Sequence, residues 1–371
     1  MKKLIENRLE RIRKSIFDSK LDTFMVLIEE NRRYLSGFTG EDTQFDESAG
    51  ALFITAKELI LATDSRFELQ ASNQAPLFEI VCYKEGLVKL LPDLLKRLQT
   101  KRLGFESIRL SYSQYKKIVE QLNTANLEVK LVETNDLVEN LRVIKEEIEI
   151  EATKKALTLA ESVFSSFIKT ISRGMTEKEA AWAMEKRMRE AGADSLSFPT
   201  IVASGPNSAL PHAIPGEREF KAGEPLLFDW GARLNGYCSD ISRTLVIGNP
   251  DETFQKVYHA VLEAQKRAIE AIRPGVSSKA VDEIARSYID QMGFKDKFGH
   301  GLGHGTGLAV HEAPRLSPLK DTILEPNMVF TVEPGIYLPD WGGIRLENMV
   351  VVREDGVEVL NSLDAANFRA E

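Results

Sequence analysis

The chain of 371 residues is poor in cysteine: Cys82 and Cys238 are its two cysteines. So few cysteines cannot build a disulfide framework, and they are typical of a chain that folds in a reducing compartment. No apolar run approaches the ~20 residues that a membrane-spanning helix needs. The first residues are basic, as in a signal peptide, but Glu6 and Glu10 stand where an apolar core would be. We therefore expect a helix there, a cytoplasmic protein, and no membrane partner.

The sequence also lacks an excess of positive charge, because 48 Lys and Arg stand against 56 Asp and Glu, for a net charge of −8. Nothing in this balance favours a phosphate backbone, so we expect no nucleic-acid partner. Hydrophobic residues make up 43% and charged residues 28% of the chain, which are ordinary values for a soluble globular protein. The length allows two domains or one large one.

The first 140 residues alternate between helical and strand patterns. Apolar residues recur at helical spacing from Leu4 to Ile16, so the chain should begin with an amphipathic helix. This alternation predicts a compact α/β domain. Strand patterns occupy residues 23–28, 51–63 and 127–132, and helical patterns occupy 92–100 and 111–122.

A long helical pattern follows at residues 138–171, as one helix or two abutting ones. It either joins two domains or belongs wholly to the second. Beyond it, helices are expected at 176–193, 252–275 and 277–293; the first opens with a capping box of Thr176 and Glu179. Helices and hairpins alternate in two similar halves, which indicates an internal repeat.

Residues 225–248 predict a hairpin, because the tight-turn dipeptide Asn235-Gly236 separates two apolar runs. This turn pairs Asp229 with position 242, or with Asp240 if the turn shifts by one residue. Either register leaves the two carboxylates on one face. Two adjacent buried carboxylates need a cation, a proton or an arginine. The alternative is an aspartate paired with a neighbouring arginine at the surface.

Residues 331–352 predict a second hairpin, with a turn at 339–343. Pairing Leu338 with Ile344 makes Glu333 a diagonal neighbour of Glu347 on the same face. Arg345 shares the parity of Glu347 and is placed to orient it by a charge-assisted hydrogen bond. One such acid pair is weak evidence of a binding site. Two acid pairs in the same domain are stronger evidence, because they are less readily explained by chance.

Residues 298–312, FGHGLGHGTGLAVHE, hold three of the five histidines, with glycine at every second position from 299 to 307. If this segment is extended, His300 and His304 share one face, and the bare opposite face admits another backbone closely. His311 breaks the alternation, so a bend should precede it. The segment matches neither a phosphate-binding loop, nor GxGxxG, nor HExxH.

The remaining histidines differ in their surroundings. His212 lies in a segment rich in Gly, Pro and Asn, residues 198–216, and loops on a rigid scaffold are frequent homes of binding groups. His259 lies inside a helical pattern, and we interpret it as an ordinary helix residue.

The ordered set of Asp229, Asp240, His304, Glu333 and Glu347 resembles the five metal ligands of the pita-bread metallopeptidases. These include Xaa-Pro aminopeptidase, prolidase and methionine aminopeptidase. The resemblance extends to the spacing of the two aspartates and to the contexts TVEPG and RLEN. The segments NRRYLSGFTG (31–40) and DSRFELQA (64–71) resemble the creatinase/prolidase amino-terminal domain, which favours the proline-directed branch.

The resemblance implies an α/β (α+β) architecture of two domains. Residues 1–140 would form a small creatinase-like α/β domain. Residues 141–371 would form a pita-bread catalytic domain with pseudo-twofold halves of helices and antiparallel sheet. By the same resemblance we expect a homodimer.

The resemblance also implies a role for each ligand. Asp229 would bind one metal through both oxygens, Asp240 and Glu347 would bridge two metals, and His304 and Glu333 would complete the other site. Four carboxylates and one imidazole form a hard donor set that suits Mn²⁺, with Co²⁺ or Zn²⁺ as substitutes. Two such ions, ~3.5–4 Å apart, can share a hydroxide that is nucleophilic at neutral pH.

The remaining site residues are expected to face the substrate. His212 and His311 match histidines of the family that contact the peptide near the scissile bond and help to stabilise the tetrahedral intermediate. His300 and Arg345 are expected to bind substrate nearby. Glu333 is our candidate to carry the proton from the water to the leaving nitrogen.

The predicted activity is hydrolysis of the Xaa-Pro bond at the N-terminus of peptides that have proline at the second position. The first alternative is a prolidase, which cleaves only the Xaa-Pro dipeptide. A methionine aminopeptidase with an added domain is a further alternative. A metal-free creatinase-like enzyme or a binding module is disfavoured, because all five ligand positions are intact.

Overall fold

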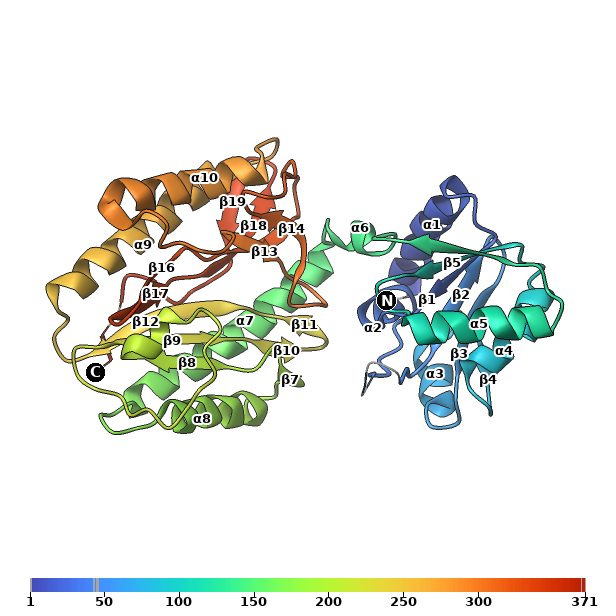
Figure 1. Ribbon diagram of the computed structural model, residues 1–371, viewed down its shortest axis with the longest axis horizontal. Coiled ribbons are helices and arrows are strands. Elements are labelled where there is room, and N and C mark those ends of the chain that lie inside the picture. Colours follow the sequence, from blue (N-terminus) through green and yellow to red (C-terminus); the bar gives the residue numbers. More distant parts are fainter. Residues whose placement is uncertain (1, 43, 45–46, 368, 371) are drawn as a thin grey trace. The chain divides into compact units, whose positions relative to one another are not determined.

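The computed structural model describes residues 2–42, 44, 47–367 and 369–370, and it divides into two compact units, Met1–Leu141 and Arg142–Glu371 (Figure 1). Within the described residues, no helix is both long enough and apolar enough to cross a membrane.

The first unit is an α/β domain built on a six-stranded mixed sheet with the strand order β4-β3-β2-β1-β5-β6. Strands β1, β2 and β3 are antiparallel neighbours, while β4, β5 and β6 join the sheet in parallel. Its strands are β1 (Thr23–Val26), β2 (Ala51–Thr55), β3 (Leu59–Thr63), β4 (Glu79–Cys82), β5 (Arg102–Glu106) and β6 (Lys130–Thr134), and its helices are α1 (Lys2–Asp18), α2 (Glu29–Ser36), α3 (Glu68–Gln74), α4 (Leu87–Arg97) and α5 (Tyr112–Thr124).

The predicted elements of this unit are present, but two of them are shifted. The helix expected at 92–100 begins five residues earlier, at Leu87, with Pro92 inside it. Leu91, Leu94 and Leu95 are buried on one face of α4, so core packing extends the helix on the N-terminal side of the proline. The strand expected at 127–132 begins at Lys130, where it pairs with β5.

The helical pattern at 138–171 forms two helices, α6 (Glu139–Arg142) and α7 (Glu147–Phe167), separated by residues 143–146. The second unit begins at Arg142, so α7 belongs to it. The unit also contains α8 (Glu177–Glu190), α9 (Glu252–Ala271), α10 (Ser278–Ile289), the 3₁₀ segments η1 (Ile168–Thr170) and η2 (Gly205–Ala209), and the π-helical turn η3 (Asp290–Phe294).

The caps explain where these helices begin. Thr176 and Glu179 form the predicted capping box of α8, Asp251 caps α9, and Ser277 caps α10 through its hydroxyl. The strands of the unit are β7 (Ser195–Leu196), β8 (Ile201–Ser204), β9 (Pro225–Trp230), β10 (Ala232–Leu234), β11 (Tyr237–Cys238), β12 (Ile241–Ile247), β13 (Gly303–Gly305), β14 (Glu312–Leu316), β15 (Val329–Val332), β16 (Gly335–Leu338), β17 (Gly342–Arg345), β18 (Asn348–Arg353), β19 (Gly356–Val359) and β20 (Arg369–Ala370).

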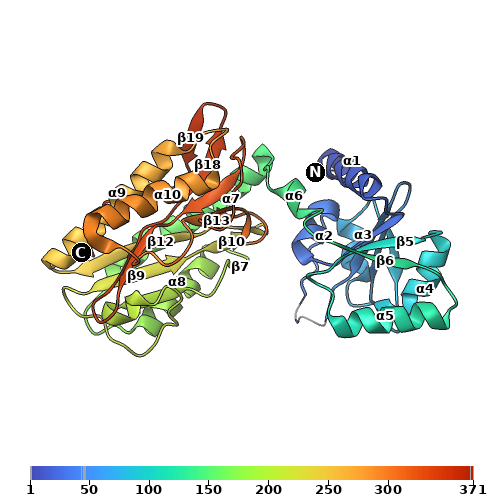
Figure 2. The same cartoon turned by 45° about the horizontal axis from the view of Figure 1, so that its top comes forward.

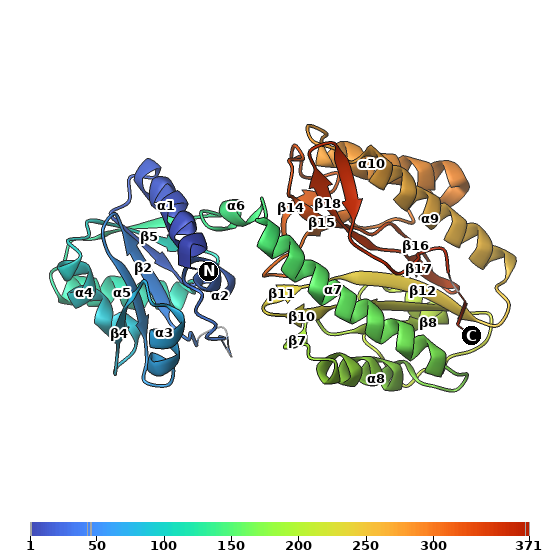
Figure 3. The same ribbon diagram turned by 180° about the vertical axis from the view of Figure 1, so that it is seen from behind.

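The second unit has two halves of the same kind, each a pair of helices against antiparallel strands (Figures 2 and 3). In the first half, α7 and α8 pack on β8, β9 and β12, and Trp230 stacks on Phe164 with ring centroids 4.1 Å apart. In the second half, α9 and α10 pack on β15 and β18 and on their neighbours. The α+β architecture of two similar halves is therefore as predicted.

Each half contains a hairpin that leaves one sheet and enters another. The strands β9 and β12 pair in a four-stranded sheet, while their continuations β10 and β11 pair in a three-stranded sheet. Likewise β15 and β18 pair in a five-stranded sheet, while β16 and β17 form a sheet of their own. The two acid pairs lie at or beside these junctions, where a side chain is held by rigid strands on both sides.

Candidate metal centre

The first acid pair has the predicted geometry. Asp229 pairs with Ser242, and the same register continues to the turn at Asn235 and Gly236, which both have positive φ. Asp240 lies two residues before Ser242, so both carboxylates project from one face of the hairpin. Asp240 is buried, and Asp229 is largely so.

The second acid pair lies on one face as predicted, but the predicted register is wrong by two residues. Leu338 pairs with Gly342, and Gly335 with Arg345. Extending that register, or the one that pairs Val332 with Asn348, places Glu333 directly opposite Glu347. The turn is shorter than expected because both glycines after it belong to β17.

Those glycines stand where no side chain fits. A Cβ at Gly343 would lie 2.2 Å from the carbonyl oxygen of Ser208, and a Cβ at Gly342 would lie 2.6 Å from Pro225 Cγ. The glycines serve a close approach of β17 to η2 and β9 rather than the turn itself.

His304 lies in β13, between β14 and β15. The glycines beside it allow this approach, because a Cβ at Gly303 would lie 1.9 Å from the carbonyl oxygen of Thr331 and one at Gly305 would lie 2.1 Å from that of Ala313. The close backbone approach predicted for the bare face is confirmed. The extended part is shorter than the glycine pattern suggested: it covers Gly303–Gly305, so His300 lies outside it.

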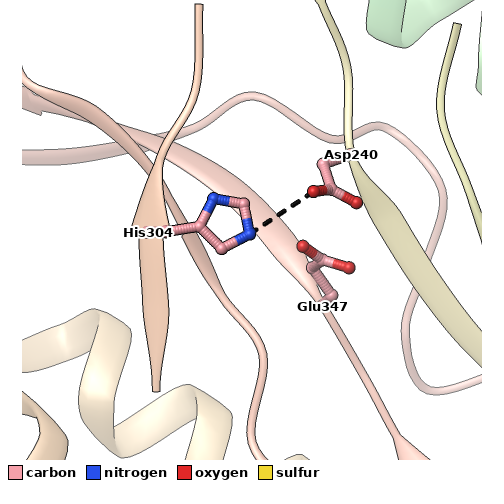
Figure 4. A group of neighbouring side chains, drawn as sticks. All are labelled: Asp240, His304 and Glu347. Atoms are coloured by element: carbon pink, nitrogen blue, oxygen red, sulfur yellow. Dashed lines mark ion pairs between the residues drawn. The ribbon is translucent and has the colours of Figure 1, made fainter. Parts of the chain in front are cut away.

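Asp240, His304 and Glu347 converge, with one ligand atom from each within 4.8 Å of the others (Figure 4). His304 Nε2 lies 3.5 Å from an oxygen of Asp240 and 3.4 Å from Oε1 of Glu333. Its other ring nitrogen, Nδ1, lies 3.1 Å from the carbonyl oxygen of Gly305. If Nδ1 carries the proton and donates it there, the lone pair of Nε2 faces the carboxylates, as a metal ligand requires.

The electrostatics of this cluster favour bound protons or a bound cation over three free carboxylates. Burial raises the pKa of Asp240, Glu347 and Glu333, for Glu333 to about 7, and their mutual repulsion adds to the effect. Burial lowers the pKa of His304 to about 3, so its imidazole is neutral at neutral pH. The Nε2 lone pair of His304 and the carboxyl oxygens of the acids therefore face one another across a small space.

Two carboxylate oxygens of the cluster lack hydrogen-bond partners among the described residues. Asp229 Oδ1 and Glu347 Oε1 are buried and have no hydrogen-bond partner in the part of the chain that the structure describes. An unpaired buried carboxylate oxygen is costly, and a divalent cation would satisfy both. Because the donors are four carboxylates and one imidazole, the residues present fit hard divalent ions.

Arg345 neutralises part of this charge from behind the acids. Its Nη2 donates to Asp229 Oδ2 at 2.6 Å, its Nε donates to Ser242 Oγ at 2.9 Å, and its Nη1 donates to the hydroxyl of Tyr337 at 2.9 Å. Ser242 Oγ in turn donates to Glu347 Oε2 at 2.9 Å. Arg345 thus orients Asp229 directly and Glu347 through Ser242, and it is itself 2% exposed.

His300 is hydrogen-bonded within the protein through both ring nitrogens. Nδ1 lies 2.8 Å from the carbonyl oxygen of Gly301, and Nε2 lies 2.8 Å from the hydroxyl of Tyr337. Burial lowers the pKa of His300 to about 4, so the ring is neutral. This geometry favours a role in holding Tyr337 and Arg345 over direct contact with a substrate.

A cavity of about 520 Å³ opens onto the cluster, and all nine predicted site residues line it. His212 and His311 are exposed on its wall. His311 meets His304 edge to face, with ring centroids 4.3 Å apart. Bends at residues 307–311 precede β14, as the broken alternation predicted. His259 lies in α9, exposed and outside this cavity.

Three residues of the site escaped sequence reasoning. Arg315 lines the cavity, is exposed, and forms no ion pair with any residue that the structure describes. Ser242 and Tyr337 make the hydrogen bonds described above. The pairing of Asp229 with position 242 pointed to Ser242, whereas Arg315 and Tyr337 carry no signal without the arrangement of the strands.

Comparison with known proteins agrees with this geometry. The model of the metallopeptidase family M24 matches residues 151–354, and that of the creatinase/prolidase N-terminal domain matches residues 8–144. The chain is 35% identical to the Xaa-Pro dipeptidase of Pyrococcus furiosus, over 97% of this chain and 99% of that one.

Solved structures give the same result. The Xaa-Pro dipeptidase from Bacillus anthracis is 38% identical, with a TM-score of 0.92, over 98% of this chain and 99% of that one. The X-Pro aminopeptidase from Thermotoga maritima MSB8 is also 38% identical, with a TM-score of 0.86 and the same coverage.

Proposed function

The chain belongs to the metallopeptidase family M24 and carries a creatinase/prolidase N-terminal domain, and from this premise we propose that it is a metal-dependent exopeptidase that hydrolyses Xaa-Pro bonds. The observation that carries the proposal is the convergence of Asp240, His304 and Glu347 at the floor of a cavity. Sequence reasoning placed an aminopeptidase first and a dipeptidase second. Named relatives and Arg315 favour the reverse order, so the proposed substrate is the dipeptide Xaa-Pro.

The proposed metal ligands are Asp229, Asp240, His304, Glu333 and Glu347, holding two divalent ions, with Mn²⁺ as the proposed metal. When bound, such ions lower the pKa of water and polarise a carbonyl oxygen. The protein's part is to hold the donors rigidly, to keep His304 neutral and to fix the acids through Arg345 and Ser242.

Glu333 is proposed to move the proton. Thr331 Oγ1 donates to its Oε1 at 3.2 Å, and burial raises its pKa to about 7. A carboxylate beside the scissile bond can accept a proton from water and pass it to the proline nitrogen. The proline nitrogen takes the electrons of the broken C–N bond and leaves as an amine, so it needs a proton at that step.

His212 and His311 are proposed to contact the substrate beside the scissile bond. Burial lowers the pKa of His311, and the charge of Arg315 lowers it further, so the neutral imidazole is the form present. A neutral imidazole can donate a hydrogen bond to the carbonyl oxygen as negative charge develops on it.

Arg315 is proposed to bind the C-terminal carboxylate of the dipeptide. Its charge lowers the pKa of both His304 and His311, so it lies close to the cluster, and it has no carboxylate partner among the described residues. A guanidinium forms strong paired hydrogen bonds with a carboxylate, and an extended substrate would carry an uncharged amide at that position.

The test compares Gly-Pro with Gly-Pro-Gly in the presence of added Mn²⁺. We expect Gly-Pro to be the better substrate, and we expect Arg315→Gln to raise the KM for Gly-Pro by about tenfold or more, the value of a lost charge-assisted hydrogen bond. Equal turnover of the tripeptide would support the aminopeptidase instead. Activity on Met-Ala and none on Gly-Pro would contradict both.

The remaining assignments are also proposals. Residues 1–140 would form the creatinase-like domain, and residues 141–371 would form the catalytic domain. We propose a homodimer in the cytoplasm, the dimer on the family resemblance and the location on the scarcity of cysteine. Light scattering of the purified chain would measure the oligomeric state, and a monomeric mass would contradict the dimer.

A further inference from the structure

Glu177, the first residue of α8, is a fully buried carboxylate that the proposed reaction does not use. Four donors surround it, and all four come from residues 204–216. The backbone N–H of Ser204 donates to Oε1 at 2.7 Å and its hydroxyl donates at 2.8 Å. Asn207 Nδ2 donates to Oε1 at 3.1 Å, and the N–H of Gly216 donates to Oε2 at 3.1 Å.

These donors stand at both ends of the segment that carries His212. Ser204 precedes it and Gly216 follows it, so one carboxylate closes the loop at its base. The backbone of α8 strengthens the second end, where Lys178 N–H donates to the Gly216 carbonyl at 3.0 Å and Glu177 N–H donates to that of Arg218 at 3.0 Å. The loop between them is held to α8 as a unit.

The imidazole of His212 depends on this closure. Its side chain is exposed and makes no hydrogen bond with the described part of the chain, so the backbone of its loop sets where it lies. The loop has a second anchor at η2, where Ser208 Oγ accepts from Gly343 N–H at 2.8 Å. That anchor holds the start of the loop, whereas Glu177 holds both of its ends.

The surroundings of Glu177 demand a carboxylate rather than an amide. Arg218 Nη1 donates to Ser204 Oγ at 2.9 Å, so the hydroxyl has to direct its own proton to Glu177. Every polar neighbour of the two oxygens is therefore a donor. A glutamine would set its NH₂ group against one of these donors and leave a buried N–H unsatisfied.

We propose that Glu177 is a positioning residue that fixes His212 against the metal centre, an inference that rests on the proposed role of His212 in Xaa-Pro hydrolysis. Within the described part of the chain, Glu177 makes no hydrogen bond with His212. It sets the position of the His212 side chain by holding both ends of the loop that carries it.

The direct test is a carbon–proton NMR spectrum of the protein labelled at histidine. The chain has five histidines, so the spectrum contains few signals. His212→Ala assigns the His212 signal. Glu177→Gln is expected to shift that signal and to leave that of His259, in α9, in place. An unshifted His212 signal in a folded Glu177→Gln protein overturns the proposal.

Glu179→Gln is the matched control. It makes the same charge change in the first turn of the same helix, where a negative charge is favourable, while the amide oxygen can still accept from Thr176 N–H and residues 204–216 are not touched. It should therefore lower helix stability and leave the His212 signal unmoved. A His212 shift of equal size in this control would show that any weakening of α8 moves the loop, which contradicts a specific role of Glu177.

Kinetics on Gly-Pro give a second readout. Glu177→Gln should lower kcat by about 100-fold, as a displacement of about 1 Å can. In a His212→Ala background the same change should lower kcat by less than about twofold, because the two residues act as one unit. Independent, multiplying losses would contradict the proposal.

A milder variant covers the case in which Glu177→Gln does not fold. Asn207→Ala removes one of the four donors and leaves the helix intact, and it should shift the His212 signal in the same direction by less. The NMR readout needs no turnover. A chain that fails to hydrolyse Gly-Pro would refute the proposed function while this test still decides the role of Glu177.

Discussion

At the scale of single residues, the site is a set of buried acids that need protons or a bound cation in addition to Arg345. Glu333 shows this most clearly, because it faces His304, Arg345 and Asp229 and its side chain is largely buried. Arg345 compensates for one carboxylate through its bond to Asp229. The remaining negative charge is the physical reason to expect bound metal.

Glu333→Gln should lower kcat for Gly-Pro by at least about 100-fold, because it removes both a proposed ligand and the group proposed to carry the proton. Turnover with added Mn²⁺ measures this effect. The exposed Glu325→Gln is the matched control and should retain full activity. Wild-type kcat in Glu333→Gln would remove Glu333 from the mechanism.

The pH dependence of stability in the presence of a chelator isolates the same carboxyl group. Its pKa of about 7 in the folded chain exceeds the ordinary value of 4.5, so between these values the folded chain holds a proton that the unfolded chain has released. The stability that this group contributes is present below about pH 4.5 and is lost as the pH rises to about 7.

Glutamine does not titrate, so Glu333→Gln should gain stability relative to the wild type across that range and level off above it. The difference between the two proteins removes the opposing contribution of His300 and His304, whose pKa values are lowered. Urea unfolding at several pH values measures the free energy of unfolding. A difference that does not change with pH would contradict the raised pKa.

At the scale of elements, the acids were predictable and the contacts between elements were not. Alternation in two hairpins places Asp229 with Asp240 and Glu333 with Glu347 on shared faces, and that periodicity is local. The register of the second hairpin does not depend on local sequence alone. Gly342 and Gly343 are packed against Pro225 and Ser208, which come from elsewhere in the chain. The same holds for Arg315, whose place in the cavity follows from the path of β14 and not from its neighbours in sequence.

The glycines of β13 permit a test at this scale. Gly303→Ala would place a Cβ 1.9 Å from the Thr331 carbonyl oxygen, so β13 and β15 would have to separate. We expect a loss of about 1–3 kcal/mol in the free energy of unfolding, together with weaker metal binding as His304 moves. Gly299→Ala, in the same glycine-rich segment, meets nothing within 4 Å and should change neither quantity. Equal effects of the two changes would contradict the close-approach account.

At the scale of the whole chain, the candidate metal centre joins the two halves of the second unit. Asp229 and Asp240 come from the hairpin of the first half; in the second half His304 comes from β13, Glu333 from between β15 and β16, and Glu347 from between β17 and β18. A cation held by all five is a cross-link between the halves, and it binds the folded chain alone. Metal binding should therefore stabilise the fold by mass action.

Thermal unfolding measures this link. Added Mn²⁺ should raise the Tm of the chelated protein by an amount that grows with the metal concentration, and Asp240→Asn should remove most of the shift. Asp290→Asn, at an exposed aspartate of the same unit, is the control and should keep the shift. A Tm that does not respond to divalent metal would contradict a cross-link between the halves.

Turnover of Gly-Pro measured against the bound metal per chain tests the central claim most directly. The account predicts no hydrolysis by the fully chelated chain, a rise in rate as Mn²⁺ fills the site, and a plateau once the site is full. Hydrolysis at the full rate by a chain that holds no metal would contradict it.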